Sequence, residues 1–279
     1  MHAADAIRSR LGLQILFDFS DIVAAIEFAA ANAFPVLELN LGNRHFAAQL
    51  ENSHERARIR AAARRHKLTL AVHAIEGPSF FVPSRRVVDA GVTETKLLLN
   101  HCRDAGIAKV IKHLGFEMHY GQGAGYVYPH DFYPDFYREL VRDALAELKN
   151  HARGRARLCI ENVGGFRYPF VRELLDRMLG GWLGLCYDIG HTNILKPEEK
   201  RAETEFFTRH LKHICHCHVH DNNGVRDEHL APGKGRIDFV PPLSMLAATN
   251  ATLTFEVRPK EAALEARELF DRTIAPRLN

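Results

Sequence analysis

Acidic and histidine side chains recur at the ends of short apolar segments of this chain. His73, His113, Glu161 and Glu256 each close such a segment. The sixth segment ends in Asp188-Ile-Gly-His191, and the seventh ends in His216, His218 and His220, with Asp227-Glu-His229 shortly after. Imidazoles and carboxylates are common protein ligands of zinc and other transition metals. This combination of residue types predicts a metal site.

The four carboxylates of this set would repel one another if they shared one site. They are Glu161, Asp188, Asp227 and Glu256. Two carboxylates about 4 Å apart repel by roughly 4 kcal/mol at an effective dielectric constant near 20. Protonation or bound cations must relieve that repulsion. The many imidazoles favour zinc or manganese over magnesium or calcium, which prefer oxygen ligands. We therefore expect divalent ions, Zn or Mn, with one to three per chain.

The segments that carry these residues alternate with amphipathic helical stretches, such as residues 132–151. Repetition of this kind is typical of βα units around a parallel sheet. Eight strands are predicted, at Leu11–Phe17, Val36–Leu41, Leu68–His73, Lys109–His113, Arg157–Glu161, Leu183–Asp188, His213–His220 and Thr252–Glu256. Since no linker rich in Pro, Gly or Ser interrupts the series, the fold class predicted is α/β, a (β/α)8 TIM barrel, with residues 1–279 as one domain.

Strand periodicity indicates that the polar ends face the barrel interior. Two residues before each end lie Ala71, Ile111, Cys159, Cys186 and Thr254, which share its face because side chains alternate along a strand. Inward groups at the carboxyl ends of barrel strands meet at the mouth, where barrel enzymes have their active sites. His216, one pleat deeper, is predicted to be a core residue or to support a ligand.

The longest connection, residues 114–131, contains three tyrosines and four glycines. A connection of this length is typical of a lid or substrate loop over a barrel mouth. We expect its tyrosines, with Phe80, Phe81 and Phe116, to shield a substrate from water, or else to pack within the loops.

Composition narrows the classes of partner. Lys and Arg exceed Asp and Glu by three, a mild excess that neither requires nor excludes nucleic acid. The arginines of residues 53–67 are predicted to form a solvated helix face. With no run of about 20 apolar residues and no apolar run of signal-peptide length at the start, we expect a cytoplasmic protein without a membrane partner. The five cysteines are expected to be reduced, and the oligomeric state stays open.

Several motifs give the chain a resemblance to a known family. The runs KHLG, IENVGG, YDIGHTN, HVHDNNGVRDEHLAPGKGRIDF and TFEVRP follow one another at the ends of strands four to eight. In this order they resemble the xylose isomerase-like TIM barrel superfamily, which includes sugar-phosphate isomerases and epimerases as well as endonuclease IV enzymes. The resemblance implies one metal held by Glu161, Asp188, His218 and Glu256. In the endonuclease IV branch, five further ligands match His73, His113, His191, Asp227 and His229.

The surrounding residues depart from the endonuclease IV pattern. That pattern has Cys where this chain has Gly190, Asn where it has His220, and Asp-Arg-His where it has Asp227-Glu228-His229. The run PGKGRIDF is more similar to the epimerases. The resemblance therefore favours a sugar or sugar-phosphate isomerase or epimerase in which Glu161 and Glu256 transfer a proton through an enediolate.

The substrate of that reaction is a small carbohydrate, with Arg258, Lys234, His220 and Glu38 as weaker candidates to contact it. The alternative is a metal-dependent phosphodiesterase that acts on abasic DNA, as endonuclease IV does; only this alternative brings nucleic acid as a partner. Its candidate DNA contacts are Arg44, Arg85 and Arg86. A barrel that binds metal without catalysis is the third reading.

Overall fold

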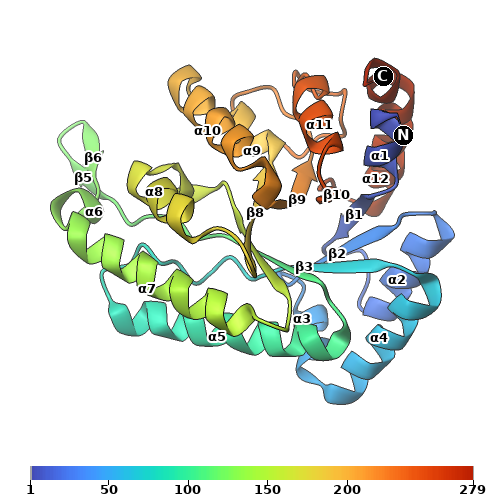
Figure 1. The fold of residues 1–279 in the computed structure, drawn as a ribbon, viewed down its shortest axis with the longest axis horizontal. Coiled ribbons are helices and arrows are strands. Elements are labelled where there is room, and N and C mark those ends of the chain that lie inside the picture. Colours follow the sequence, from blue (N-terminus) through green and yellow to red (C-terminus); the bar gives the residue numbers. More distant parts are fainter. Residues whose placement is uncertain (1, 279) are drawn as a thin grey trace.

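The computed structural model describes residues 2–278 and is built around a closed barrel of parallel strands (Figure 1). Around the barrel the strand order is β1-β10-β9-β8-β7-β4-β3-β2. The strands are β1 (Leu11–Ile15), β2 (Val36–Asn40), β3 (Thr69–His73), β4 (Lys109–Lys112), β7 (Arg157–Glu161), β8 (Leu183–Asp188), β9 (Ile214–Val219) and β10 (Thr252–Phe255). The eight predicted strands are confirmed, and their observed ends differ by one or two residues at most.

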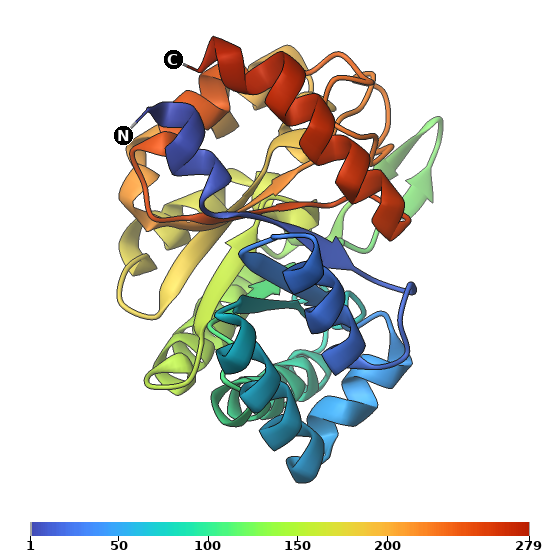
Figure 2. The ribbon, with the colours of Figure 1, turned by 90° about the vertical axis from the view of Figure 1, so that its right-hand side faces the viewer.

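Helices surround the barrel and cover the outer faces of its strands (Figures 1 and 2). They are α1 (Ala3–Arg8), α2 (Ile22–Ala31), α3 (Arg44–Glu51), α4 (Ser53–His66), α5 (Arg85–Ala105), α6 (Pro129–Phe132), α7 (Pro134–Ala152), α8 (Pro169–Met178), α9 (Ile189–Asn193), α10 (Pro197–Arg209), α11 (Val240–Ala247) and α12 (Lys260–Leu269). The two ends of the chain lie close together in both views. An ion pair joins them, with Arg8 Nε 2.8 Å from Asp271 Oδ1.

Helix α7 shows how the sequence determines this layer. Pro134 occupies its first turn, where a missing N–H costs no hydrogen bond. Its buried residues include Leu140, Ala144 and Leu148, which recur at helical spacing and form the predicted apolar face. Helix α4 buries only Ile59, Ala62 and Ala63, so most of its arginines lie on a solvated face, as predicted.

Small and apolar side chains fill part of the barrel interior below the mouth. Ala71, Ile111, Cys159, Cys186 and Cys215 form a buried cluster of their own, separate from the larger core between the barrel and its helices. Four of these five are residues that periodicity placed inward, so the predicted strand faces are confirmed. All five cysteines are buried and free, as expected for reduced core residues.

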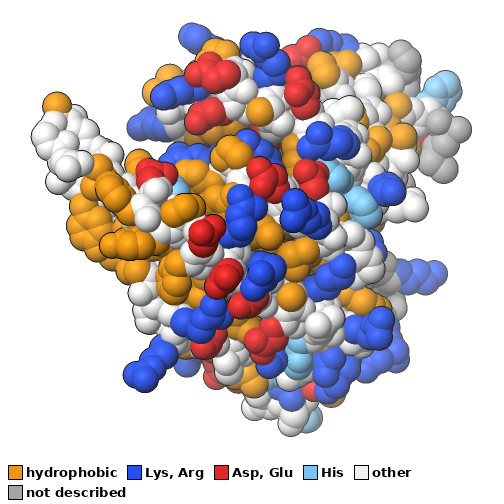
Figure 3. Space-filling view, turned by 60° about the vertical axis from the view of Figure 1, so that its left-hand side comes forward, with side chains coloured by type: hydrophobic (Ala, Val, Ile, Leu, Met, Phe, Trp, Pro, Cys, Tyr) orange, Lys and Arg blue, Asp and Glu red, His pale blue; other side chains and the backbone are white. Residues whose placement is uncertain are grey.

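The predicted lid forms a hairpin that projects from the body of the protein (Figure 1). Its strands β5 (Tyr120–Gln122) and β6 (Gly125–Val127) pair antiparallel, and Tyr120 and Tyr126 are exposed. Hydrophobic side chains gather beside this projection (Figure 3). Among residues 2–278, no helix combines the length and hydrophobicity that crossing a membrane requires.

Candidate metal centre

The barrel places all nine predicted ligands at one mouth. Strands deliver four of them directly, because Glu161 and Asp188 are the last residues of β7 and β8, His73 is the last of β3, and His218 lies near the end of β9. His113 and Glu256 directly follow β4 and β10. His191 lies on α9, while Asp227 and His229 lie in the loop after β9.

Glu161 lies at the centre of the group. Its Oε2 is 3.3 Å from His73 Nε2 and 3.2 Å from His113 Nε2. On the other side, its Oε1 is 3.3 Å from His191 Nδ1 and 3.6 Å from His218 Nδ1. Each oxygen of Glu161 thus has two imidazole nitrogens beside it, so Glu161 could hold a cation together with these histidines.

His218 joins Glu161 to the other carboxylates. Its Nδ1 lies 3.3 Å from Asp188 Oδ2 and 2.9 Å from Glu256 Oε2. The side chains of these four residues are almost fully buried, none being more than 6% exposed. The four residues that the family resemblance assigns to a single metal therefore form one compact group.

A second group lies beside the first, around Asp227. The Oδ2 atom of Asp227 is 3.2 Å from His191 Nε2 and 2.9 Å from His229 Nε2. His220 extends this group, since its Nε2 lies 3.0 Å from Asp188 Oδ1 and its ring stacks on that of His229 with centroids 4.2 Å apart. His220 was a candidate for substrate contact, but it is fully buried within the cluster instead.

Many of these close atoms do not form hydrogen bonds with one another. Within residues 2–278, the buried atoms without a hydrogen-bond partner include His113 Nε2, His191 Nδ1, His218 Nδ1, Glu161 Oε2 and Glu256 Oε2. Buried polar atoms nearly always have a partner, so five unsatisfied atoms in one place require an explanation. These nitrogen and oxygen atoms approach one another without hydrogen-bond geometry. Their lone pairs are therefore directed at common positions between the side chains. The donor set fits divalent cations with mixed nitrogen and oxygen ligands.

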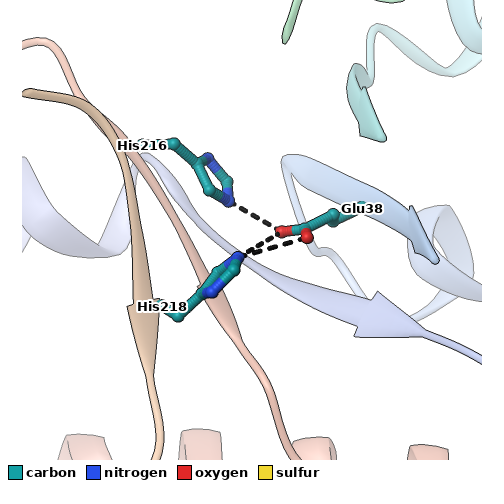
Figure 4. A group of neighbouring side chains, drawn as sticks. All are labelled: Glu38, His216 and His218. Carbon is teal, nitrogen blue, oxygen red and sulfur yellow. Dashed lines mark hydrogen bonds and ion pairs between the residues drawn. The ribbon is translucent and has the colours of Figure 1, made fainter. Parts of the chain in front are cut away.

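Glu38 supports His218 from below the mouth (Figure 4). Both oxygens of Glu38 lie 3.2 Å from His218 Nε2, which leaves His218 Nδ1 directed at the carboxylates. The Oε2 atom of Glu38 also lies 2.7 Å from His216 Nε2 and accepts a hydrogen bond from Thr254 Oγ1. Glu38 was a candidate for substrate contact, but it is fully buried and its oxygens already have these partners. His216, predicted to be a core residue or to support a ligand, is fully buried and contacts Glu38.

Backbone carbonyls orient two other imidazoles in the same way. His73 Nδ1 lies 2.9 Å from the carbonyl oxygen of Ala74, and His229 Nδ1 lies 2.9 Å from that of Glu256. In each ring the Nδ1 atom then carries a hydrogen, and the Nε2 atom points into the cluster. Partners of this kind fix the tautomer of metal-binding histidines and raise their basicity.

Replacing Glu38 with glutamine is expected to weaken metal binding about 10-fold to 100-fold, the usual effect of losing such a supporting partner. The glutamine keeps the volume but presents its amide where His218 Nε2 and His216 Nε2 need an acceptor. Competition with a chelating dye measures the affinity. Glu147→Gln on α7, whose wild-type carboxylate pairs with Lys96 at the surface, is the matched control. Equal affinity in wild type and Glu38→Gln would exclude a role for Glu38 in orienting His218.

The cluster holds its carboxylates in the ionised form. Burial raises the pKa of Glu161, but His113, His218 and His191 outweigh it and the pKa falls well below its usual value. Burial also opposes ionisation of Glu256, whose pKa is lowered to about 2, chiefly by His218. Conversely, the pKa of His218 is raised well above its usual value against the effect of burial, by Cys186 and by the carboxylates around it. A cation that binds at the mouth would therefore meet ionised carboxylates and would replace protons on the histidines.

Sequence reasoning missed Gln14 on β1. Its side-chain nitrogen donates to Glu38 Oε1 and to Glu256 Oε1, at 3.1 and 3.0 Å. Its oxygen accepts a 2.7 Å hydrogen bond from Arg258 Nη2. Gln14 thereby connects these two glutamates to Arg258 at the rim of the mouth. An isolated amide in the apolar run Leu11–Ile15 was the signal that could have revealed it.

Asp221 was also missed, and it shapes the loop that carries Asp227 and His229. Its carboxylate accepts hydrogen bonds from the backbone N–H groups of Gly233, Gly235 and Ile237. The backbone of Asp221 also pairs with that of Leu230, next to His229. The glycines of the PGKG run therefore let the chain fold around a buried carboxylate.

A cavity of about 290 Å³ opens above the cluster. Its lining is His73, Glu76, His113, Phe116, Glu161, Val163, His191, Ile194, Asp227, His229, Glu256 and Arg258. Arg258 therefore lies where a substrate contact was predicted. Lys234 does not line the cavity, since its Nζ pairs with Glu265 on α12 at 2.6 Å. Phe80 and Phe81, expected as possible walls, are fully buried in the packing instead, which leaves Phe116 as the aromatic wall.

A comparison with protein-family models finds the xylose isomerase-like TIM barrel model over residues 26–273. The chain belongs to this family. Two relatives match over shorter stretches: an uncharacterized protein of Sinorhizobium fredii, 32% identical over 105 residues, and one of Methanocaldococcus jannaschii, 37% identical over 95 residues. These matches span 37% and 34% of this chain. They cover 32% and 34% of the lengths of the two relatives.

Solved structures of the family share the fold over nearly the whole chain. A D-tagatose 3-epimerase-like protein superposes with a TM-score of 0.75 at 20% identity, over 94% of this chain and 96% of its own. The 3-keto-D-glucoside 4-epimerase of E. coli gives a TM-score of 0.72 at 15% identity, over 94% of this chain and 98% of its own. Endonuclease IV from Thermus thermophilus gives a TM-score of 0.65 at 17% identity, again over 94% of this chain and 98% of its own. At such identities the likeness shows the fold alone.

Gly190 and His220, two of the three departures from the endonuclease IV pattern, contact each other in this family member. A Cβ atom at position 190 would lie 2.0 Å from His220 Cε1, a distance at which atoms overlap. His220 therefore occupies the space that a cysteine side chain at position 190 would need. The two departures form one steric unit, and together they add an imidazole to the Asp188 side of the cluster.

Proposed function

We propose that the protein is a metal-dependent isomerase or epimerase that acts on a sugar or sugar phosphate. The observation that carries this proposal is the compact group of Glu161, Asp188, His218 and Glu256 below a small cavity. Its atoms without hydrogen-bond partners, described above, support the same proposal. A divalent cation held there supplies a Lewis acid that polarises a carbonyl and acidifies the C–H bond beside it.

The two glutamates are suited to move the proton. Glu161 ends β7 and Glu256 follows β10, and two strands, β8 and β9, separate them around the barrel. A substrate in the cavity would therefore have one carboxylate on each side. Both pKa values are lowered against the effect of burial, so both groups are bases at neutral pH. One takes a proton from the carbon beside the carbonyl, and the other returns to that carbon a proton that it has taken up from solvent.

The cavity itself suits a small polar substrate. Its volume of about 290 Å³ corresponds to about ten water molecules at roughly 30 Å³ each, which is about the size of a monosaccharide. Arg258 is the one arginine or lysine among the lining residues, and it donates to Gln14 and Glu256. Its position at the rim suits a substrate hydroxyl or phosphate.

A second candidate function is a phosphodiesterase of the endonuclease IV type. The observation that favours it is the presence of the five additional side chains around the central four, with Glu161 between two pairs of imidazoles. Sites with several ions suit displacement at phosphorus. Against it, none of the three arginines proposed for DNA contact lines the cavity, and Arg44 and Arg85 pair with Glu51 and Asp143.

Solvent exchange distinguishes the two functions. The metal-loaded protein is incubated in deuterated water with a set of ketoses, aldoses and sugar phosphates, and NMR follows the carbon beside the carbonyl. We expect deuterium at that carbon with at least one substrate, and none with Glu161→Gln. A protein that exchanges no substrate but nicks an abasic duplex would contradict the isomerase and support the phosphodiesterase.

A further inference from the structure

A second cavity, of about 210 Å³, lies on the outer side of the barrel wall. It is bounded by helices α3 and α5 and by the residues that follow β2 and β3. Apolar side chains such as Leu50 and Leu98 form most of its wall, and the exposed Ile75 and Leu97 lie at its edge. None of its lining residues lines the cavity above the metal cluster. It is thus a separate site.

Lys112 lies among these lining residues. It precedes His113 on the chain, and because side chains alternate along a strand, Lys112 points toward the helices while His113 points into the mouth. The residue is 2% exposed, and its Nζ lies 5.1 Å from the centroid of the Phe80 ring. Apolar residues normally fill outward positions of barrel strands, so a lysine here calls for a partner.

Apart from the Phe80 ring, the structure gives Lys112 no partner. Within residues 2–278, its Nζ makes no hydrogen bond and no ion pair. Lys109 on the same strand differs, because its Nζ donates to the carbonyl oxygen of Cys215 and to Thr252 Oγ1, both at 2.6 Å. A buried ammonium without a counter-ion is costly, and an anionic ligand would remove that cost.

We propose that this cavity binds a small monocarboxylate with a short apolar tail. The carboxylate accepts hydrogen bonds from Lys112 Nζ, and the tail packs against Leu50 and Leu98. Room for about seven waters at roughly 30 Å³ each corresponds to a ligand of about seven heavy atoms, such as isovalerate. Glu51, Glu94 and His101 also line the cavity, but the two glutamates are exposed and Glu51 pairs with Arg44, which leaves Lys112 as its buried charged group. One cationic donor suits a carboxylate better than phosphate, which needs several donors.

Calorimetric titration of the full-length protein with isovalerate tests this proposal. We expect saturable binding with a Kd on the order of 1 mM, as is reasonable for so small a ligand. Binding of 3-methylbutan-1-ol, which has the tail without the charge, should be at least tenfold weaker. The same holds for acetate, which has the charge without the tail.

The matched variants are Lys112→Met, which keeps the length of the side chain, and Lys96→Met on α5, which removes a charge outside the cavity. Lys112→Met should weaken isovalerate binding at least tenfold, and Lys96→Met should leave it unchanged. If Lys112→Met does not fold, the NMR signal of the Lys112 side chain in the wild type replaces it, and it should shift on adding isovalerate. Absent binding to wild type, equal binding to Lys112→Met, an unmoved Lys112 signal or preferential binding of inorganic phosphate would each overturn the proposal.

Discussion

Glutamine in place of Glu161 is expected to lower the rate of proton transfer at least 1,000-fold while leaving the barrel folded. Removing a positioned general base alone costs roughly 100-fold to 10,000-fold. Glu161 is also the carboxylate on which four imidazoles converge, so its loss removes a candidate metal ligand as well. The measurement is the rate of solvent deuterium exchange at saturating metal, with far-UV circular dichroism to establish the fold.

Glu256→Gln should have a comparable effect on the same rate, because the proposal needs one carboxylate on each side of the substrate. Glu147→Gln on the surface of α7 is the control for a charge lost elsewhere, and its rate should match the wild type. A Glu161 or Glu256 variant that retains wild-type activity would exclude that residue as acid or base.

Metal affinity is expected to rise steeply with pH up to about pH 9. Burial lowers the pKa of His73, but Glu161 and other carboxylates outweigh it and raise the pKa to about 9. The pKa of His191 is also raised well above its usual value, against the effect of burial, chiefly by Asp188. Both imidazoles are therefore protonated at neutral pH before metal binds, and a ligand nitrogen must lose its proton. Each displaced proton adds about tenfold to the affinity per pH unit, so two protons add about 100-fold.

Chelator competition between pH 6 and pH 9 measures this dependence, and calorimetry in two buffers of different ionisation enthalpy counts the released protons. Histidines of ordinary pKa would instead give an affinity that levels off above about pH 6.5. His73→Asn should reduce the number of released protons by one. Affinity that is constant between pH 7 and pH 9 would contradict the assignment of these imidazoles as ligands.

The positions of the candidate ligands could be predicted because strand geometry is regular. A polar residue at the end of an apolar strand lies on the same face as the residue two positions earlier, such as Ala71 or Cys159, and therefore points inward. In a closed barrel the inward side chains at the strand ends meet at the mouth. The same argument placed His216 one pleat below the mouth. It did not show that His216 and His218 would contact both oxygens of Glu38.

Loops and outward-facing side chains could not be predicted in this way. The role of Asp221 depends on three backbone N–H groups more than ten residues away, and no periodic pattern marks such contacts. The direction of the β5–β6 hairpin and the burial of Phe80 and Phe81 depend on packing between loops. Lys112 stands in the sequence as one charged residue in a short strand, and only the structure shows the cavity beside it.

The metal content of the purified protein tests the central claim most directly. The protein is stripped with chelator, dialysed against zinc or manganese, and analysed by mass spectrometry for metal per chain. The account predicts one to three tightly held ions per chain, and a smaller number in Asp188→Asn and in His218→Asn. One ion would favour the epimerase and three the phosphodiesterase. A wild-type protein that retains no metal, or variants that retain as much as wild type, would contradict the account.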